Sequence, residues 1–312
     1  MEELKIILQY FPNHIKETIF QNISASITEH IEEIRIRLNR PIVLKIGQEV
    51  MIIEHIINKE EIDEIFERIC ENSIYSYKKE ICEGFITIKG GHRVGITGTA
   101  VIEEKLKNIN YISSLNFRIA REKKDSSKEI IKNIINSKEN NIYNTLIISP
   151  PGCGKTTMLR DIIRNISNGI KELEFSPKVI GLVDERGEIA ATYKGVPQND
   201  IGIMTDIMSN FPKSIGIKML IRSMSPQIIV CDEIGGKEDV EAIKIATCSG
   251  VKGIFTAHGK NLEEVIKNPE LSQLLNQNIV ERVIQLSAKE KGIAEKIYDC
   301  RSWGNIQKKS SI

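Results

Sequence analysis

The sequence predicts an α/β protein in two parts, in which a smaller α+β domain with an antiparallel sheet precedes a domain built on a parallel sheet. Three observations lead to this prediction. Apolar and polar residues alternate with the period of strands in the first part, short apolar strands alternate with helices from about Glu129, and a charged stretch at 121–127 separates the two patterns. We therefore expect domains at 1–125 and 126–304, followed by a disordered tail at 305–312.

Helical and strand periods mark the elements of the first part. Residues 59–73 carry apolar side chains at helical spacing, which predicts an amphipathic helix. Residues 34–38 and 115–119 alternate apolar with polar side chains, which predicts strands with one solvated face. The segment 84–101 has a Gly-Gly pair between two strand-like runs, which predicts a β-hairpin.

The second part repeats a pattern of strand then helix. Short apolar strands are predicted at 145–149, 179–184, 228–232 and 253–257. An amphipathic helix follows the first of these strands, and another begins near Asp239 after the third. Short, nearly continuous apolar strands that alternate with helices indicate a parallel sheet covered on both faces.

Length and charge limit the class of protein. The 312 residues, of which 41% are hydrophobic, suffice for one large or two ordinary domains with buried cores. Lys and Arg number 43 against 42 Asp and Glu, so the net charge of +1 gives no overall attraction for nucleic acid or anionic lipid. No apolar run approaches the roughly 20 residues that cross a bilayer, and the acidic N-terminus is not typical of a secretory signal. We expect a cytoplasmic protein.

Six cysteines are scattered along the chain, without a CxxC pair or a nearby histidine at zinc-ligand spacing. We interpret each as a free thiol that serves as a small buried hydrophobic residue, and none as a nucleophile. These residues are Cys70, Cys82, Cys153, Cys231, Cys248 and Cys300.

The strongest chemical signal is the segment 149–157, which follows an apolar strand and opens an amphipathic helix, the context of a P-loop. Glycines let backbone N–H groups turn toward phosphate oxygens, and the helix N-terminus adds positive potential. Lys155 would neutralise charge on the β- and γ-phosphates, and the Thr156 hydroxyl would bind Mg²⁺, so ATP and Mg²⁺ are the expected cofactors. The predicted nucleotide-binding residues are Ser149, Pro150, Pro151, Gly152, Cys153, Gly154, Lys155, Thr156 and Thr157.

Polar side chains end three further strands of the predicted parallel sheet. Asp232 and Glu233 follow one strand, where Asp232 would hold Mg²⁺ and Glu233 would orient or deprotonate the attacking water. Glu185 follows a second strand, and Thr256 and His258 end a third, where they can sense a γ-phosphate. A lone histidine is more often structural, but the carboxyl ends of parallel strands meet at one edge, and this convergence favours a functional one.

Arg93 and Arg118 lie on the polar faces of predicted strands in the first part. On spacing alone, a solvated sheet face is the favoured interpretation of both. The alternative is contact with nucleotide, in which the guanidinium groups stabilise charge in the transition state.

The order of these motifs resembles the stage III sporulation protein AA family, which is itself similar to the type II and type IV secretion ATPases and the pilus-retraction motors. The resemblance covers nearly the full length and implies a RecA-like P-loop NTPase domain behind the α+β domain. Ser149 departs from the family, in which glycine is usual, and its Cβ would be strained if the backbone there needed a positive φ. The motifs are EEIRIRLNRPI, GFITIKGGHRVGITG, SPPGCGKTTMLRDIIR, VDERGEIA, VPQNDIGIMTDIM, IRSMSPQIIVCDEIG and GIFTAHG.

The resemblance also implies residue roles. Glu185 falls at the acidic residue of the secretion ATPases' Asp box, Glu233 at their Walker B glutamate, and His258 in their His box. Arg93 and Arg118 match positions from which the retraction motors supply arginines to nucleotide, which favours the functional interpretation of both. The predicted catalytic residues are Glu233, Glu185, Lys155, His258, Arg93 and Arg118, and the predicted metal ligands are Thr156 and Asp232.

Three hypotheses of function follow. The first, implied by the resemblance, is a Mg²⁺-dependent ATPase in a ring of six subunits, docked from the mother-cell cytoplasm on membrane proteins of the channel to the forespore. The second is a nucleotide-binding structural platform of that channel with little turnover, which Ser149 motivates. The third, a nucleic-acid-stimulated motor, is disfavoured because Lys78-Lys79 and Lys123-Lys124 are short basic runs, typical of solvated faces. No nucleic-acid partner is expected.

Overall fold

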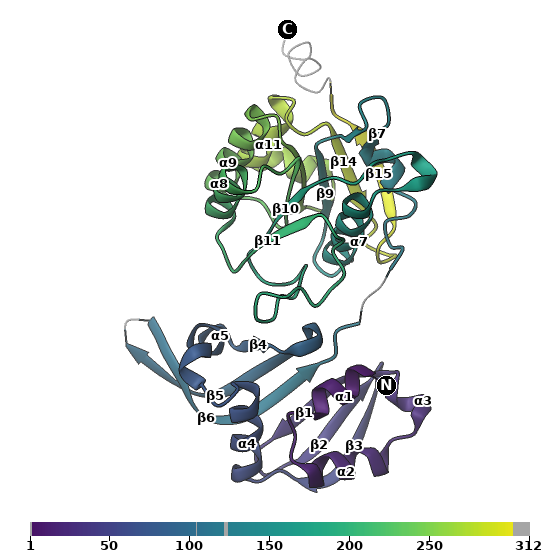
Figure 1. Ribbon diagram of the computed structural model, residues 1–312. Helices are drawn as coiled ribbons and strands as arrows, with labels where there is room; N and C mark the ends of the chain where they lie inside the picture. Colours follow the sequence, from purple (N-terminus) through teal and green to yellow (C-terminus); the bar gives the residue numbers. More distant parts are fainter. Residues whose placement is uncertain (1, 104, 122–123, 302–312) are drawn as a thin grey trace. The chain divides into compact units, whose positions relative to one another are not determined.

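A computed structural model describes residues 2–103, 105–121 and 124–301 (Figure 1). They form two compact units. Unit 1 contains the chain up to Arg121 together with Ala191–Gln198, and unit 2 contains the rest. Residues 191–198 lie between two stretches of unit 2 in the sequence, and no local feature of the sequence predicts that they belong to unit 1. The tail predicted at 305–312 lies outside the described residues.

Unit 1 is built on an antiparallel sheet of six strands in the order β3-β2-β1-β6-β5-β4. In β1, Ile34 and Ile36 are fully buried while Arg35 between them is only half-buried, as strand alternation requires. The buried face packs with apolar residues of the helices into one core. The strands are β1 (Ile31–Arg37), β2 (Pro41–Ile46), β3 (Glu49–Ile56), β4 (Phe85–Thr87), β5 (Arg93–Glu103) and β6 (Lys105–Arg118), and the α-helices are α1 (Glu2–Leu8), α2 (Asn13–Asn22), α3 (Ala25–Thr28), α4 (Lys59–Ile69) and α5 (Lys78–Glu83).

The helix and the hairpin predicted for unit 1 are present. The helix predicted at 59–73 is α4, which ends at Ile69. It begins with a capping box, in which the Asn58 side chain accepts from the Glu61 N–H at 2.8 Å and the Glu61 carboxylate accepts from the Asn58 N–H at 2.9 Å. The predicted hairpin is the antiparallel pair β4 and β5.

Unit 2 contains a sheet of seven strands in the order β11-β10-β12-β13-β9-β14-β15. All neighbours in it are parallel except β14 and β15, so the predicted parallel sheet carries an antiparallel edge strand that the sequence did not predict. The strands are β9 (Thr145–Ser149), β10 (Ile180–Asp184), β11 (Thr205–Ser209), β12 (Ile228–Cys231), β13 (Lys252–His258), β14 (Arg282–Leu286) and β15 (Ala294–Asp299); β7 (Ile135–Asn136) and β8 (Asn141–Ile142) form a separate pair.

Helices cover both faces of this sheet, as predicted. Leu146 and Ile148 of β9 pack in one cluster with α8, α9 and α11, whereas Ile147 packs in another with α7. Figure 1 shows α8 and α9 on one side of the strands and α7 on the other. The helices are α6 (Ile131–Ile134), α7 (Lys155–Asn168), α8 (Lys213–Ser223), α9 (Lys237–Cys248), α10 (Leu262–Lys267) and α11 (Pro269–Asn276).

The cysteine prediction is correct in part. All six are free thiols, and Cys70, Cys153, Cys231 and Cys300 are buried. It is wrong for Cys248, which is exposed, and for Cys82, which is half-buried. Cys248 follows the buried Ala246 of α9 by two positions, about 200° around the helix, which turns it to the solvent side.

Within the described part of the chain, no helix combines the length and the apolar character that a membrane crossing requires.

Candidate functional site

The carboxyl ends of four parallel strands of unit 2 meet at one edge of the sheet. These strands are neighbours in the order β10-β12-β13-β9. Ser149 ends β9 directly beside His258, the last residue of β13. Asp232 follows β12, and Asp184 ends β10. The structure therefore brings together the strand ends that the sequence singled out.

The P-loop joins β9 to α7 in a conformation that requires glycine. Gly152 and Gly154 have φ of 78° and 92°, in the left-handed region. A Cβ on Gly154 would also stand 3.3 Å from the backbone nitrogen of Gly292. Ser149, in contrast, is the fully buried end of a regular strand and does not have a positive φ. The departure from the family pattern therefore introduces no backbone strain.

Lys155 is buried at the start of α7 and surrounded by oxygen atoms. Its Nζ donates to the carbonyl oxygens of Ser149 and Pro150 at 2.9 and 3.1 Å, and lies 3.2 Å from the Ser149 hydroxyl and 3.4 Å from His258 Nδ1. Burial lowers the pKa of Lys155, and the charge of Glu233 opposes that shift. An ammonium group held by carbonyl oxygens at a helix N-terminus is suited to exchange them for phosphate oxygens.

Glu233 lies between His258 and Arg186. Its Oε1 is 3.0 Å from His258 Nε2, and its Oε2 is 2.5 Å from Arg186 Nη1. Its φ of 45° is uncommon for a residue with a Cβ and costs about 1–3 kcal/mol. Its backbone N–H donates to Thr256 Oγ1 at 2.8 Å. The strained turn and this hydrogen bond fix the direction in which the carboxylate points.

Asp232 carries a buried carboxylate just after the end of β12. The residue is 2% exposed, and neither of its side-chain oxygens has a hydrogen-bond partner among the described residues. Burial, followed by the nearby charge of Asp184, raises its pKa to about 6. A divalent cation with oxygen ligands would satisfy both oxygens. The residues present therefore fit Mg²⁺, with Asp232 and the half-buried Thr156 as candidate ligands.

Asp184 and Glu185 have different contacts. Asp184 is fully buried and accepts from three consecutive backbone N–H groups at 188–190, at 2.9, 3.1 and 2.8 Å, which anchors the turn after β10. Glu185 forms an ion pair with the buried Lys213. Burial opposes the charge of Lys213, but the hydrogen bond and charge of Glu185 outweigh it and raise the pKa of this lysine. Sequence reasoning missed Lys213 because it stands at a helix start outside every motif.

Arg93 and Arg118 are cross-strand neighbours in unit 1. They stand directly opposite each other on β5 and β6, and Arg118 also faces Glu33 on β1. The Arg93 guanidinium lies 4.6 Å from the centre of the Phe85 ring, and Arg118 is exposed. Opposite positions share one face of a sheet, so the two guanidinium groups lie on one face, in a row with the Glu33 carboxylate. Their contact with nucleotide stays a prediction.

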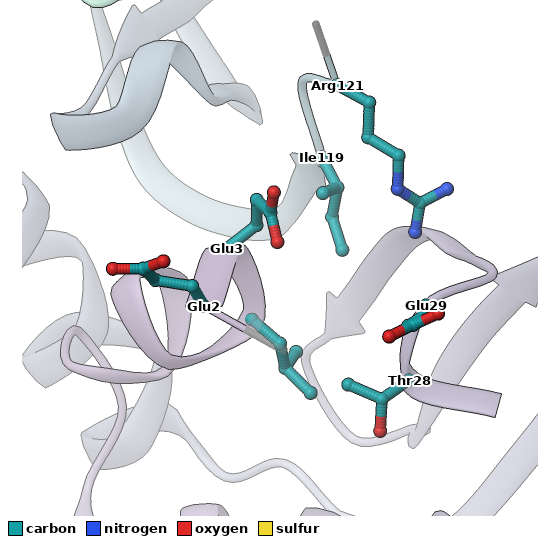
Figure 2. A pocket seen from close by; sticks show the side chains of 7 residues that line it. Glu2, Glu3, Thr28, Glu29, Ile119 and Arg121 are labelled. Carbon is teal, nitrogen blue, oxygen red and sulfur yellow. The ribbon is translucent and has the colours of Figure 1, made fainter. Parts of the chain in front are cut away.

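A separate hollow of about 510 Å³ lies in unit 1 and is lined by Glu2, Glu3, Glu29 and Arg121 among others; in Figure 2 the Glu2 carboxylate is directed away from Arg121 and Glu29. A backbone hydrogen bond is the main cause of the lowered pKa of Glu3, which keeps this carboxylate anionic at neutral pH. The Arg121 Nη2 donates to the carbonyl oxygen of Ile31 at 2.6 Å. Three carboxylates and one guanidinium line this hollow, and their net negative charge would repel phosphate, so the nucleotide candidate remains the edge of unit 2.

The Thr256→Val substitution is expected to reduce phosphate release from ATP by about tenfold, because the Glu233 N–H would lose its acceptor at the strained turn. Thr145→Val, which removes a buried hydroxyl that donates to the Tyr143 carbonyl at 2.8 Å on the same sheet, serves as the control. Both variants should lose about 1–3 kcal/mol of stability, but only Thr256→Val should lose rate. Equal rates in the two variants would exclude a directing role for Thr256.

Comparison with known proteins identifies relatives over nearly the whole chain. The family model for sporulation stage III, protein AA, matches residues 2–304. Stage III sporulation protein AA of Bacillus subtilis (strain 168) is 38% identical over 297 residues, which cover 92% of this chain and 95% of that protein.

Two solved structures share the fold at low sequence identity. The Legionella pneumophila ATPase DotB has a TM-score of 0.60 at 15% identity, over 96% of this chain and 87% of its own. The pilus retraction motor PilT with bound ADP has a TM-score of 0.56 at 13% identity, over 87% and 76%. These likenesses confirm the predicted fold, a RecA-like domain with a parallel sheet preceded by a smaller α+β domain.

Proposed function

The chain belongs to the stage III sporulation protein AA family, and from that premise we propose that it is a Mg²⁺-dependent ATPase. The observation that carries the proposal is the run of contacts from Lys155 through His258 to Glu233 at the carboxyl edge of the sheet, 3.4 Å and 3.0 Å at its two steps. It joins the cation that would hold the phosphates to the carboxylate that would act on water. A P-loop serving only to bind nucleotide has no need of the second group.

Each residue has a distinct task in this proposal. Lys155 neutralises the β- and γ-phosphates, and backbone N–H groups of 151–157 bind their oxygens. Glu233 accepts a proton from the attacking water, and His258, in contact with both Lys155 and Glu233, senses whether the γ-phosphate is present. Mg²⁺ held by Asp232 and Thr156 would offset charge on the transferred group. Glu185, which is paired with Lys213, would contribute to catalysis at the same carboxyl edge of the sheet.

The proposal extends to assembly and place. We assign domains to 1–125 and 126–304, and we assign Arg93 and Arg118 of the first domain to the nucleotide, where their guanidinium groups would stabilise charge in the transition state. Six copies would form a ring, and loss of the γ-phosphate would change its shape. The ring would act in the mother-cell cytoplasm, held at the outer forespore membrane by membrane proteins of the sporulation channel. The motor would energise that channel.

Phosphate release with MgATP over a series of protein concentrations tests the proposal. We expect turnover that rises with concentration as subunits assemble and stops when EDTA removes Mg²⁺. The Lys155→Ala variant sets the background, since it lacks the cation that anchors the phosphates. If the protein binds ATP but shows no Mg²⁺-dependent release of phosphate at any protein concentration, the proposal that it is an ATPase is wrong.

The structural platform remains the second candidate, and the same measurement separates the two. The serine at position 149 motivated this hypothesis, because strain there would impair turnover. The backbone at Ser149 is a regular strand without a positive φ, so this reason no longer applies. A platform predicts assembly that needs ATP but no release of phosphate by the wild type. A Ser149→Gly variant with unchanged turnover would show that this position has no effect on the chemistry.

A further inference from the structure

We propose that unit 1 carries a binding site for a transition-metal ion of the Zn²⁺ type, built from His14, His55 and Glu61. The three come from α2, β3 and α4, which are separate in the sequence. One ligand atom of each lies within 4.8 Å of the other two. None of these three residues belongs to the proposed ATPase site, whose P-loop and carboxylates lie in unit 2.

The contacts converge on one oxygen atom. Glu61 Oε1 is 2.6 Å from His14 Nε2 and 2.9 Å from His55 Nε2. The two imidazole rings are tilted by 52° with centres 5.7 Å apart, so they approach the carboxylate from different directions. Two imidazole nitrogens and one carboxylate oxygen form a donor set that zinc sites use, with a fourth position left for water. Small rotations that separate the three atoms to about 3.3 Å would admit Zn²⁺ at its usual 2.0–2.1 Å.

The surroundings favour a fixed carboxylate with an open entry. Glu61 is 7% exposed, and its other oxygen is held by the Asn58 N–H at 2.9 Å, which orients the carboxylate as outer contacts do for metal ligands. The side chain of His14 is 58% exposed, so an ion can reach the site from solvent.

A metal ion here would tie α2, β3 and the start of α4 together. These elements contribute to the single core of unit 1. Binding that occurs only in the folded state raises stability in proportion to the logarithm of ion concentration over the dissociation constant. The effect would therefore be seen as a rise in melting temperature, without any need for nucleotide.

The experiment uses the full chain without an affinity tag, cleared of metal and kept in excess Mg²⁺, which competes poorly for imidazole ligands. ZnCl₂ is titrated by calorimetry and followed by melting temperature, and CoCl₂ provides a visible spectrum. His14→Ala, His55→Ala and Glu61→Gln remove one ligand each, and the glutamine side chain of the last variant can still complete the capping box of α4. His30→Ala, an exposed histidine in unit 1 outside the cluster, is the matched control.

We expect one equivalent of Zn²⁺, a melting temperature raised by at least about 5 °C, and a Co²⁺ spectrum of nitrogen and oxygen ligands in wild type and His30→Ala. Each ligand variant should weaken binding by roughly 100-fold or more. His14→Ala changes an exposed side chain and so tests the site even if the other variants fold poorly. Equal binding in wild type and the ligand variants, a thiolate–Co²⁺ band that alkylation of Cys248 and Cys82 removes, or no binding at all would overturn the proposal. If His14, His55 and Glu61 form only a hydrogen-bonded cluster that responds to pH, the experiment will show no metal binding, which overturns the proposal.

Discussion

The Glu233→Gln variant is expected to bind ATP as tightly as the wild type and to release phosphate about 1,000-fold more slowly. General-base catalysis contributes between 10²- and 10⁴-fold, and the amide of glutamine cannot accept the proton of the attacking water. The substitution preserves the volume of the side chain, and the amide oxygen can still accept from Arg186 or His258. The backbone at φ 45° and its hydrogen bond to Thr256 are untouched, so the loss would report chemistry and not folding.

Glu241→Gln is the matched control, because Glu241 is an exposed glutamate on α9 of the same unit, paired with Lys244. It should bind and hydrolyse ATP like the wild type. Binding is measured with a fluorescent ATP analogue and turnover in single-turnover mixing, so that chemistry is separated from product release. If Glu233→Gln turns over at the rate of the wild type, Glu233 has no role as the base.

The Asp232→Asn variant is expected to be more stable than the wild type by about 3 kcal/mol above pH 6, in the absence of metal, and to lose the response to Mg²⁺. The pKa of Asp232 is raised from 3.8 to about 6 in the folded protein, and each pKa unit corresponds to about 1.4 kcal/mol. Well below pH 3.8 the carboxyl is protonated in both the folded and the unfolded chain, and it contributes nothing to the pH dependence. As pH rises from 4 to 6 the unfolded chain ionises first, so folding becomes less favourable until the full penalty is reached.

Urea unfolding at a series of pH values, with EDTA and then with Mg²⁺, measures this effect. Asp161→Asn is the informative control, since Asp161 is also buried in unit 2 but is fully hydrogen-bonded by Ser127 and Arg164. Burial acts to raise its pKa, but those hydrogen bonds and the charge of Arg164 prevail and lower it. Its stabilisation is present at neutral pH and lost as pH falls, so Asp161→Asn should destabilise where Asp232→Asn stabilises. A pH-independent difference between Asp232→Asn and the wild type would show that Asp232 is not a strained buried charge.

Sequence was sufficient for the parts of the site that are local in the chain. The P-loop, the strand that ends at Asp232 and the strand that ends at His258 each combine a run of apolar residues with a polar ending, and parallel strands place such endings at one edge. The positive φ of Gly152 and Gly154 likewise follows from the kind of turn that a P-loop makes. These features need no knowledge of distant residues.

Features that depend on distant residues could not be predicted. The carboxylate of Asp184, at the end of β10, accepts from the N–H groups of 188–190, a set of contacts that the strand pattern does not predict. Lys213 lies 28 residues from its partner Glu185, and His14 lies 47 residues from Glu61, at spacings that no motif specifies. Such contacts follow from how helices and strands pack, and packing depends on the whole core. The same limit applies to 191–198, because no local pattern predicts that these residues belong to unit 1.

The grouping of 191–198 with unit 1 also bears on how far this protein is modular. Within unit 1, Glu71 is bonded to both Tyr193 and Lys194, and the Gln198 side chain accepts from the Gly90 N–H at 2.8 Å. A fragment that stops at Arg121 lacks these partners, and a fragment that starts at 122 exposes the residues that make them. The chain passes from one unit to the other three times, so a single cut cannot yield two complete folding units. We therefore expect gene fusion or shuffling to preserve the fold only when it transfers unit 1 and unit 2 together.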